Sequence, residues 1–190
     1  MNTTKRLFLF VGRIASGKET QGRMLADALH AELFMTGARF RDIINSGSPL
    51  GKRIKGDYEK GLLMPAWVAV YMFQDFLFKL SDDTHAVFEG TGRAQEEAQM
   101  FEEVATWLGR PYTVFNLKVS PETVVARSLK RNRDSADAEE VVKTRLAEFE
   151  RLTAPAIGYF QSIGTCIDID GEQPVDKIHA EIMSHVASLK

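Results

Sequence analysis

The most constraining feature of this sequence is a short apolar run joined through a glycine-spaced loop to a segment with helical periodicity. Leu7 to Val11 are all apolar, which is typical of a fully buried β-strand, and residues 18–30 have the apolar spacing of a helix. Between the two, Gly12, Gly17 and Lys18 occupy the first, sixth and seventh positions of the pattern G-x-x-x-x-G-K. In this context the pattern predicts a loop whose backbone holds a phosphate group.

Such a loop binds an anion because the N–H groups in the first turn of a helix have no partner within the helix. The helix dipole adds a positive potential at the same place. Lys18 would extend from there to the outer phosphates of a nucleotide. The alternative is a glycine-rich turn with a solvated lysine, but the strand before the loop and the helix after it favour the phosphate site.

The composition fits one globular domain with a sizeable core, since 190 residues include 44% hydrophobic and 26% charged side chains. The formal net charge of −2 argues against general binding to nucleic acid, which requires a basic surface. Any site for a polyanion must therefore come from local clustering of arginine and lysine. The only cysteine, Cys166, can form no internal disulfide, and we expect it to be a small buried apolar side chain.

No segment reaches the roughly 20 apolar residues that a membrane-spanning helix needs. Lys5 and Arg6 precede the first apolar run in the manner of a signal peptide. That run is too short for the apolar core of such a signal, however, and Arg13 follows it closely. We therefore expect a cytoplasmic protein without membrane contact.

Short apolar runs alternate with longer amphipathic segments along the chain. The runs that we expect to form strands are Leu7–Val11, Leu33–Met35, His85–Phe88, Val114–Val119 and Cys166–Ile169. The segments with helical periodicity lie near residues 18–30, 66–80, 94–108, 121–132, 138–152 and 174–189. This alternation predicts an α/β fold in which a five-stranded parallel sheet has helices on both of its faces.

Ligands of such sheets bind at the carboxyl ends of the strands. The glycine-spaced loop follows the first run, Thr36-Gly37 the second and Glu89-Gly90 the third. Residues 36–65 are rich in glycine, and we expect them to form an insertion of short helices over this edge. Residues 131–137 are expected to form a short charged loop.

The segment 66–80 is apolar over most of its length. We expect it to form a helix that is buried between the sheet and the insertion. The alternative is that one of its faces makes a subunit contact.

Further short motifs follow in order along the chain. They are Lys18-Glu19-Thr20-Gln21, Thr36-Gly37 with Arg41, Gly61-Leu62-Leu63-Met64-Pro65, Glu89-Gly90-Thr91-Gly92-Arg93, and the arginines Arg127, Arg131, Arg133 and Arg145. With these motifs the chain, from about residue 6 to its C-terminus, resembles the adenylate kinase branch of the nucleoside monophosphate kinases, in the form with a short lid.

The resemblance implies a P-loop NTPase fold in which residues 36–65 bind the monophosphate and residues 131–137 form the lid loop. It implies a monomer that transfers the γ-phosphoryl group of ATP reversibly to AMP with the help of Mg²⁺. The ATP-binding residues would be Gly12, Ala15, Ser16, Gly17, Lys18, Glu19, Thr20 and Arg127. The monophosphate would contact Thr36, Gly37, Arg41, Leu62, Leu63, Met64, Gly90, Arg93, Glu97, Arg133 and Arg145. The migrating phosphoryl would be neutralised by Lys18, Arg93, Arg127, Arg131, Arg133 and Arg145.

The implied arginines suit this chemistry, because two phosphate chains that repel each other must be brought together. Arginine grips phosphate through a planar fork and does not lose its proton. Arg127 and Arg131 are four residues apart and share one helix face. Without the other motifs, this basic stretch would be interpreted as a solvated helix face. Thr36 likewise has an alternative role, as a cap of the helix that begins near Ala38.

The chain departs from the family pattern in the phosphate loop, where Ile14 and Ala15 replace a proline and a glycine. Glu19 follows Lys18, where the family has glycine. We expect Glu19 and Glu89 to hold a hydrated magnesium ion from its outer shell. An outward-facing Glu19 on the first helical turn is an equally good interpretation.

The second group of departures concerns the acceptor nucleotide. Gly92 replaces the family's proline before Arg93, and Glu97 stands where a glutamine pairs with the adenine of AMP. An ionised glutamate can accept a hydrogen bond from the adenine amine but cannot donate one to N1. Two alternatives therefore stay open: a kinase for CMP, UMP or a deoxynucleotide, and a nucleotide-binding regulator with weak or no transfer activity.

Overall fold

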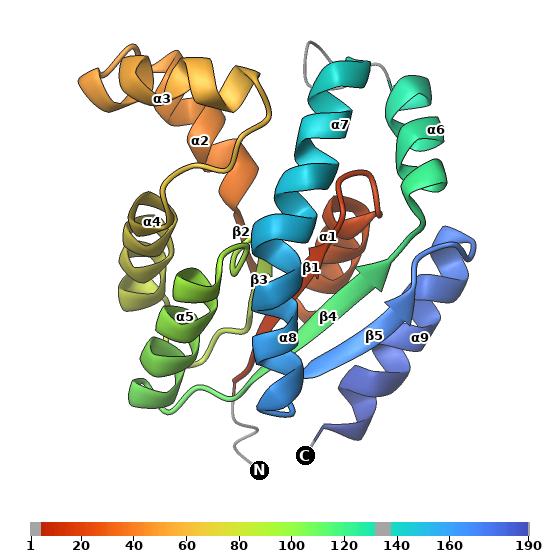
Figure 1. Ribbon diagram of the computed structural model, residues 1–190. Helices are drawn as coiled ribbons and strands as arrows, with labels where there is room; N and C mark the ends of the chain where they lie inside the picture. Colours follow the sequence, from red (N-terminus) through yellow and green to blue (C-terminus); the bar gives the residue numbers. More distant parts are fainter. Residues whose placement is uncertain (1–4, 132–137, 190) are drawn as a thin grey trace.

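Five parallel strands form the centre of the structure, a computed structural model that describes residues 5–131 and 138–189 (Figure 1). The strands are β1 (Leu7–Gly12), β2 (Glu32–Met35), β3 (Ala86–Glu89), β4 (Tyr112–Lys118) and β5 (Cys166–Asp170). Their order across the sheet is β2-β3-β1-β4-β5, and every neighbouring pair is parallel. The predicted five-stranded parallel sheet is confirmed.

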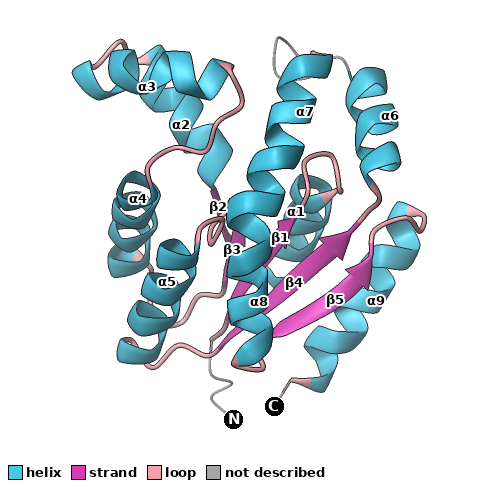
Figure 2. Ribbon diagram, viewed as in Figure 1, coloured by secondary structure: helices cyan, strands magenta, loops and turns pink. Residues whose placement is uncertain are grey.

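Helices cover both faces of this sheet, as predicted (Figure 2). They are α1 (Lys18–Leu29), α2 (Thr36–Asn45), α3 (Pro49–Glu59), α4 (Ala66–Lys79), α5 (Gln95–Trp107), α6 (Pro121–Arg131), α7 (Glu139–Glu148), α8 (Ala154–Ser162) and α9 (Val175–Ser188). Helices α4, α5 and α8 lie on one face of the sheet, and α1 and α9 lie on the other. The pairs α2–α3 and α6–α7 extend beyond the carboxyl ends of the strands (Figure 1).

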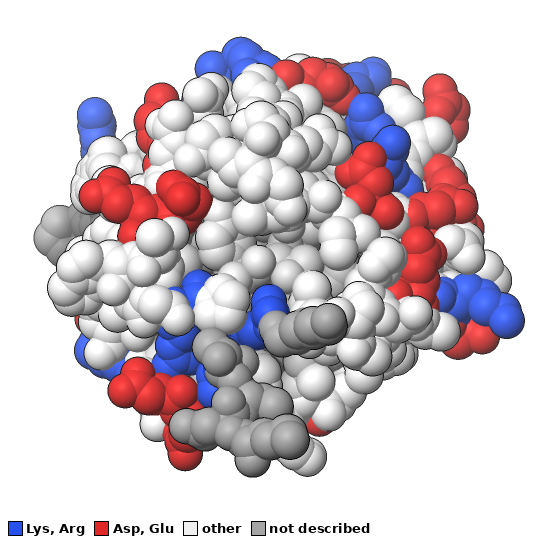
Figure 3. Space-filling view, turned by 90° about the horizontal axis from the view of Figure 1, so that it is seen from below, with Lys and Arg blue, Asp and Glu red and all other residues white. Residues whose placement is uncertain are grey.

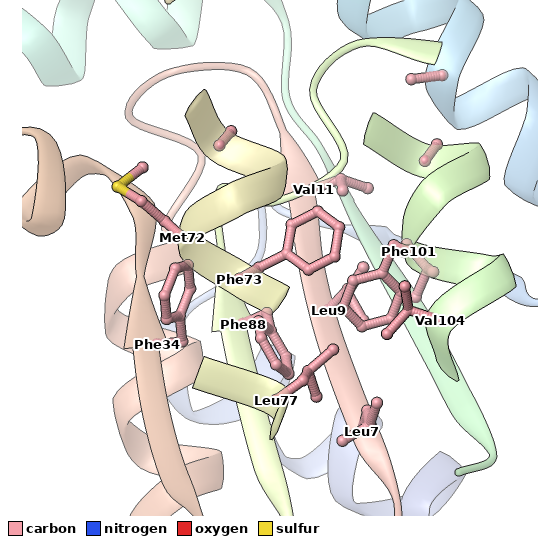
Figure 4. Close-up of a cluster of buried hydrophobic side chains, with 14 of the residues drawn as sticks. Leu7, Leu9, Val11, Phe34, Met72, Phe73, Leu77, Phe88, Phe101 and Val104 are labelled. Atoms are coloured by element: carbon pink, nitrogen blue, oxygen red, sulfur yellow. The ribbon is translucent and has the colours of Figure 1, made fainter. Parts of the chain in front are cut away.

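The core is divided in two by the alternation of side chains along β1. Leu7, Leu9 and Val11 point to the face that α4, α5 and α8 cover, where they pack in a cluster with Phe73 and Phe101 (Figure 4). The intervening Phe8 and Phe10 belong to a second cluster, which includes Leu25 of α1 and Ile178 of α9. Because both faces are buried, the strand is apolar at every position, which explains its continuous apolar sequence.

Helix α8 was not expected from the sequence. A π-helical turn, Phe149–Thr153, follows α7 and leads directly into α8, where Pro155 occupies the first turn. Proline is tolerated there because the N–H that it lacks would have no partner within the helix. Ile157 and Phe160 are buried against the sheet. The proline and Gly158 mask these few apolar contacts in the sequence pattern.

The expectation that residues 66–80 form a helix buried between the sheet and the insertion is wrong for one face of this helix. One face of α4 is in the core, but Trp67, Tyr71 and Phe78 are 65%, 69% and 60% exposed. The insertion does not cover this face, because α2 and α3 lie beyond the strand ends rather than over the middle of α4 (Figure 1).

Charges on the face shown in Figure 3 are of both signs, with basic and acidic side chains interspersed among uncharged ones. This face therefore presents no uniform basic surface. None of the helices in the described part of the chain is long and apolar enough to cross a membrane.

The only cysteine is half-buried rather than fully buried as expected. Burial in the apolar surroundings of β5 raises the pKa of the Cys166 thiol to about 12, and the charge of Asp168 adds to this effect. A thiol with such a pKa stays protonated near neutral pH and is a poor nucleophile.

The turn after β3 packs tightly on α8. Gly92 has a φ of +76°, and a Cβ at this position would lie 2.9 Å from Cε2 of Phe160. Gly164 has a similar φ of +74°, but a Cβ there would meet no atom within 4 Å. The two glycines thus share the same backbone requirement and differ in the space around them.

We predict that Gly92→Ala lowers the free energy of unfolding by about 2–4 kcal/mol, since left-handed strain and overpacking against Phe160 add together. Gly164→Ala serves as the matched control and should cost about 1 kcal/mol, from the backbone strain alone. Urea unfolding of both variants measures the difference. Equal losses would show that Phe160 does not constrain the turn.

Candidate active site

A cleft of about 1050 Å³ lies at the carboxyl ends of the strands. We call it the central cleft. The loop after β1, the first turns of α1 and α2, the segment before α4 and the turn after β3 contribute to its lining, as do α6, α7 and the start of α9. The predicted location of the site, at this edge of the sheet, agrees with the cleft.

The loop between β1 and α1, which we call the P-loop, holds its lysine in an ordered position. Lys18 is only 7% exposed, and its Nζ donates to the carbonyl oxygens of Gly12 at 2.9 Å and Arg13 at 2.6 Å. Gly17 precedes α1 with a φ of +100° and provides no side-chain cap. The first turn of α1 therefore has no side-chain acceptor at its cap, which leaves it suited to an anion.

The P-loop backbone approaches β4 closely. Gly12 has a φ of +132°, and a Cβ there would collide with the carbonyl oxygen of Leu117. Ala15 also has a positive φ, of +57°, which is unfavourable for a residue with a side chain. Ser16 is buried, and all three residues line the cleft.

Glu19 lies at the cleft, and its carboxylate accepts from Arg23 at 3.2 Å, one turn further along α1. Arg23 lines the same cleft, so the pairing holds Glu19 to its own helix, α1. Thr20, next to it, is exposed and also lines the cleft. Among the described residues, no group of three or more histidine, cysteine or acidic side chains is arranged to hold a metal ion.

The residues that we predicted to bind the acceptor nucleotide lie together on the side of the cleft opposite the P-loop. Thr36 does not cap α2: the helix begins at Thr36 itself, and its hydroxyl lies 3.0 Å from that of Thr91. Gly37 and Arg41 follow within α2, and Arg41 Nη1 lies 3.5 Å from the hydroxyl of Tyr58. The expected capping alternative for Thr36 is therefore wrong.

The segment Leu62, Leu63 and Met64 crosses the cleft between α3 and α4, and all three line it. Its position depends on α7, because the N–H of Leu63 donates to Glu148 Oε2 at 3.1 Å. Arg145, on the same helix, packs beside Gly61. Glu148 and Tyr58 were not expected at the site; both lie on helices whose mixed charged pattern is that of an ordinary surface helix.

Arg93 lies at the end of the turn that follows β3. Its Nη2 is 4.0 Å from Glu89 Oε1, and its guanidinium lies over Gly90, whose missing side chain gives it room. Glu89 and Arg93 thus form a loose pair in the cleft, with side chains that are 12% and 35% exposed.

Glu97, in the first turn of α5, supports this turn. The side chain is 4% exposed, and Oε2 accepts from the N–H groups of Gly92 and Arg93, each at 3.1 Å. Burial raises the pKa of the Glu97 carboxyl to about 7, against the effect of these hydrogen bonds and the nearby Arg93 charge. The carboxyl group therefore holds the backbone that presents Arg93, a role that was not expected from the sequence.

Arg127 and Arg131, two of the remaining predicted arginines, lie on α6. Arg127 donates to the carbonyl oxygen of Gly171 at 2.9 Å, on the side of the cleft where Gln173 and Val175 lie. Arg131 ends α6, so its backbone position is described, whereas Arg133 lies outside the described residues.

The buried Glu97 gives the protein a pH-dependent stability. A pKa above the unfolded value means that the folded state binds more protons than the unfolded state between about pH 4.5 and 7. Stability is therefore lost as the pH rises through this range. Relative to the wild type, we predict that Glu97→Gln gains about 3 kcal/mol in free energy of unfolding between pH 4.5 and 8.

Urea unfolding at several pH values measures this difference. Glu103→Gln, at an exposed position further along α5, serves as the control and should follow the wild type. A constant difference between Glu97→Gln and the wild type across the range would contradict the prediction.

Comparison with known proteins identifies the family. The family model "Adenylate kinase" matches residues 10–165. The chain is 33% identical to adenylate kinase 1 of Synechocystis sp. over 171 residues, which cover 90% of this chain and 91% of that protein. It is 30% identical to adenylate kinase isoenzyme 1 of Homo sapiens over 194 residues, covering 100% and 98% of the two chains.

A third relative, the adenylate kinase of Corynebacterium urealyticum, is 33% identical over 171 residues, 90% of this chain and 93% of its own. The match to the family model, over residues 10–165, includes the P-loop, the insertion and helices α1 to α8. The chain belongs to the adenylate kinase family.

Proposed function

We propose that this protein transfers the γ-phosphoryl group of ATP to AMP, reversibly, to give two molecules of ADP. The observation that carries the proposal is that one cleft contains both the P-loop with Lys18 and a separate set of arginines on α2, β3–α5 and α7. A single nucleotide needs only the first of these. Two nucleotides whose phosphate chains meet need both.

The donor would bind with its phosphates on the P-loop and its base towards Gln173 and Val175. The acceptor would lie between the turn that carries Arg93 and the segment Leu62–Met64, with Arg41 near its phosphate. Thr36 and Gly37 form the floor of this second site, and Gly90 and Glu97 position the turn. Transfer then depends on alignment and on neutralising the charge of the equatorial oxygens, with no covalent intermediate.

The cations have distinct tasks in this arrangement. Lys18 would leave the carbonyl oxygens of Gly12 and Arg13 to follow the migrating phosphoryl group, while Arg93, Arg127 and Arg145 approach it from three sides. We assign the same task to Arg131 and Arg133. Residues 36–65 would close over the acceptor and residues 131–137 over the donor, which excludes water and prevents hydrolysis of ATP.

Magnesium fits this site as an ion that the nucleotide brings with it. Mg²⁺ is held mainly by phosphate oxygens and water, with one or two protein carboxylates. Glu89 lies in the cleft at the end of β3, beside Arg93, whereas Glu19 pairs with Arg23. When bound, the ion would neutralise charge on the β- and γ-phosphates. We also propose that the protein acts as a monomer in the cytoplasm.

The proposal is tested by measuring ADP formation from ATP with AMP, CMP, UMP, GMP and dTMP in turn. Turnover with AMP should exceed the others by at least about tenfold, which corresponds to roughly 1.4 kcal/mol of barrier. A preference for CMP or UMP would assign a different acceptor, and binding of ATP without turnover would indicate a regulator.

Lys18→Met should reduce transfer by about 10³-fold, because a positive charge is lost where negative charge develops. Lys79→Ala removes an exposed lysine that pairs with Asp75 on α4, far from the cleft, and should keep full activity. Both variants should unfold like the wild type. Retained activity in Lys18→Met would refute the role assigned to this lysine.

Magnesium titration of the activity separates the two carboxylates. Glu89→Gln should raise the Mg²⁺ concentration at half-maximal rate several-fold, since it removes the negative charge next to the ion. Glu19→Gly should leave this concentration unchanged, because Glu19 pairs with Arg23. A shift in Glu19→Gly alone would instead restore Glu19 as the residue that holds the hydrated ion.

A further inference from the structure

Arg13 is the residue of the P-loop whose side chain does not line the central cleft, although Gly12 and Ile14 on either side of it do. Its guanidinium has three separate contacts. Nη1 donates to the carbonyl oxygen of Val119 at 2.6 Å, and Nη2 donates to Glu150 Oε1 at 2.6 Å. The guanidinium carbon lies 5.1 Å from the centroid of the Phe149 ring.

The backbone of the same residue holds the catalytic lysine. The carbonyl oxygen of Arg13 accepts from Lys18 Nζ at 2.6 Å and from the N–H of Ser16 at 3.3 Å. Arg13 therefore connects the P-loop lysine, through its own peptide, to two segments that are more than 100 residues away in the sequence.

Those two segments adjoin helices α6 and α7, which line the cleft, at the ends nearest the sheet. Val119 lies between β4 and α6, and Phe149 and Glu150 form the start of the π-helical turn after α7. A small apolar cluster supports the same junction: Ile14 of the P-loop packs against buried Val119, Val124 of α6 and Val142 of α7, and the partly buried Leu146 belongs to it as well. The P-loop is thus attached to α6 and α7 by both polar and apolar contacts.

The P-loop needs such external support because its own backbone is strained. Ala15 has a φ of +57°, a conformation that costs a residue with a side chain about 1–2 kcal/mol in general. Strained positions persist only where their surroundings fix them. Ile14 and Arg13 contribute side chains of this loop that contact α6, α7 or the segments next to them.

The contact of Arg13 with Glu150 is not a strong source of stability. The two side chains are 25% and 57% exposed, and ion pairs of this kind contribute little. The planar guanidinium instead fixes the relative positions of the two segments, because it donates to a backbone carbonyl and to a carboxylate at fixed angles.

We propose that Arg13 is a positioning residue that fixes the P-loop, and with it Lys18, to the segments that adjoin α6 and α7. By holding the loop in this place, Arg13 sets the affinity for the phosphate chain of the donor nucleotide. The proposal rests on the proposed function, since it assigns the donor to the P-loop. Arg13 acts through Lys18 and the loop backbone and does not itself touch the substrate.

The test compares Arg13→Ala, Arg13→Lys and the wild type in two measurements. Calorimetric titration with ATP, without any acceptor, gives the donor Kd. Initial rates with ATP or AMP varied separately give the two KM values. Arg13→Ala should weaken ATP binding and raise the KM for ATP by about tenfold, while the KM for AMP stays within twofold of the wild type.

Arg13→Lys keeps the charge and the apolar stem, but a lysine cannot donate to Val119 and Glu150 through one planar fork. It should therefore resemble Arg13→Ala in ATP binding while it unfolds like the wild type. Full rescue by lysine would overturn the proposal, because charge alone would then suffice. An unchanged ATP affinity in both variants, or an equal rise in both KM values, would overturn it as well.

Glu150→Ala removes one of the contacts and leaves the bond to Val119. It should weaken ATP binding two- to threefold, and the double variant Arg13→Ala/Glu150→Ala should be no weaker than Arg13→Ala. Losses that multiply in the double variant would show that Glu150 acts independently of Arg13 and would contradict the proposal.

Lys79→Ala provides the matched control, as a lysine in an exposed ion pair of α4, and should bind ATP like the wild type. The two proposals fail in different places. A wild-type protein that binds ATP but forms no ADP from AMP would refute the proposed function, whereas the binding comparison among the variants would still decide the role of Arg13.

Discussion

The structure depends on the close approach of two backbones at the carboxyl end of β1. Gly12 runs against the carbonyl oxygen of Leu117 in β4 with no room for a side chain. This contact directs the chain sharply out of the sheet and into the P-loop, so that α1 begins with its N-terminus towards the cleft. The position of Lys18 follows from this turn, because its ammonium group bonds back to Gly12.

A second constraint is the presence of buried ionisable side chains on both sides of the cleft. Lys18 and Glu97 are nearly inaccessible to solvent, and each forms hydrogen bonds to backbone groups of a turn. Each therefore makes a turn rigid: Lys18 the P-loop, and Glu97 the turn that carries Arg93. Burying a charge is costly unless it is well hydrogen-bonded, and here the backbone bonds give the two turns a defined shape.

The sequence predicts the fold well because its strongest patterns are local. The continuous apolar runs identify all five strands, and the glycine spacing places the P-loop between β1 and α1. What it does not predict depends on contacts between distant segments. The sequence does not predict helix α8, because Pro155 and Gly158 interrupt its short apolar pattern. The exposed face of α4 is likewise not predicted, because it depends on where the insertion lies.

The candidate site follows the same division. The motifs place Lys18, Arg93 and Arg41 at the cleft because the spacing of each to a strand end is fixed. The partner of Glu97 could not be inferred, since glutamate at this position allows contact with a base or with the preceding turn. Only the fold shows that Gly92 and Arg93 point their N–H groups towards it.

The exposed face of α4 also determines how the protein can be observed. Trp67 and Trp107 are the two tryptophans of the chain, and they are 65% and 79% exposed. Both indole rings are therefore already in contact with water in the native state, so their emission reports poorly on the loss of the core. Trp67, however, lies two residues after Pro65, which ends the insertion of residues 36–65. Its fluorescence is therefore suited to report motion of this insertion.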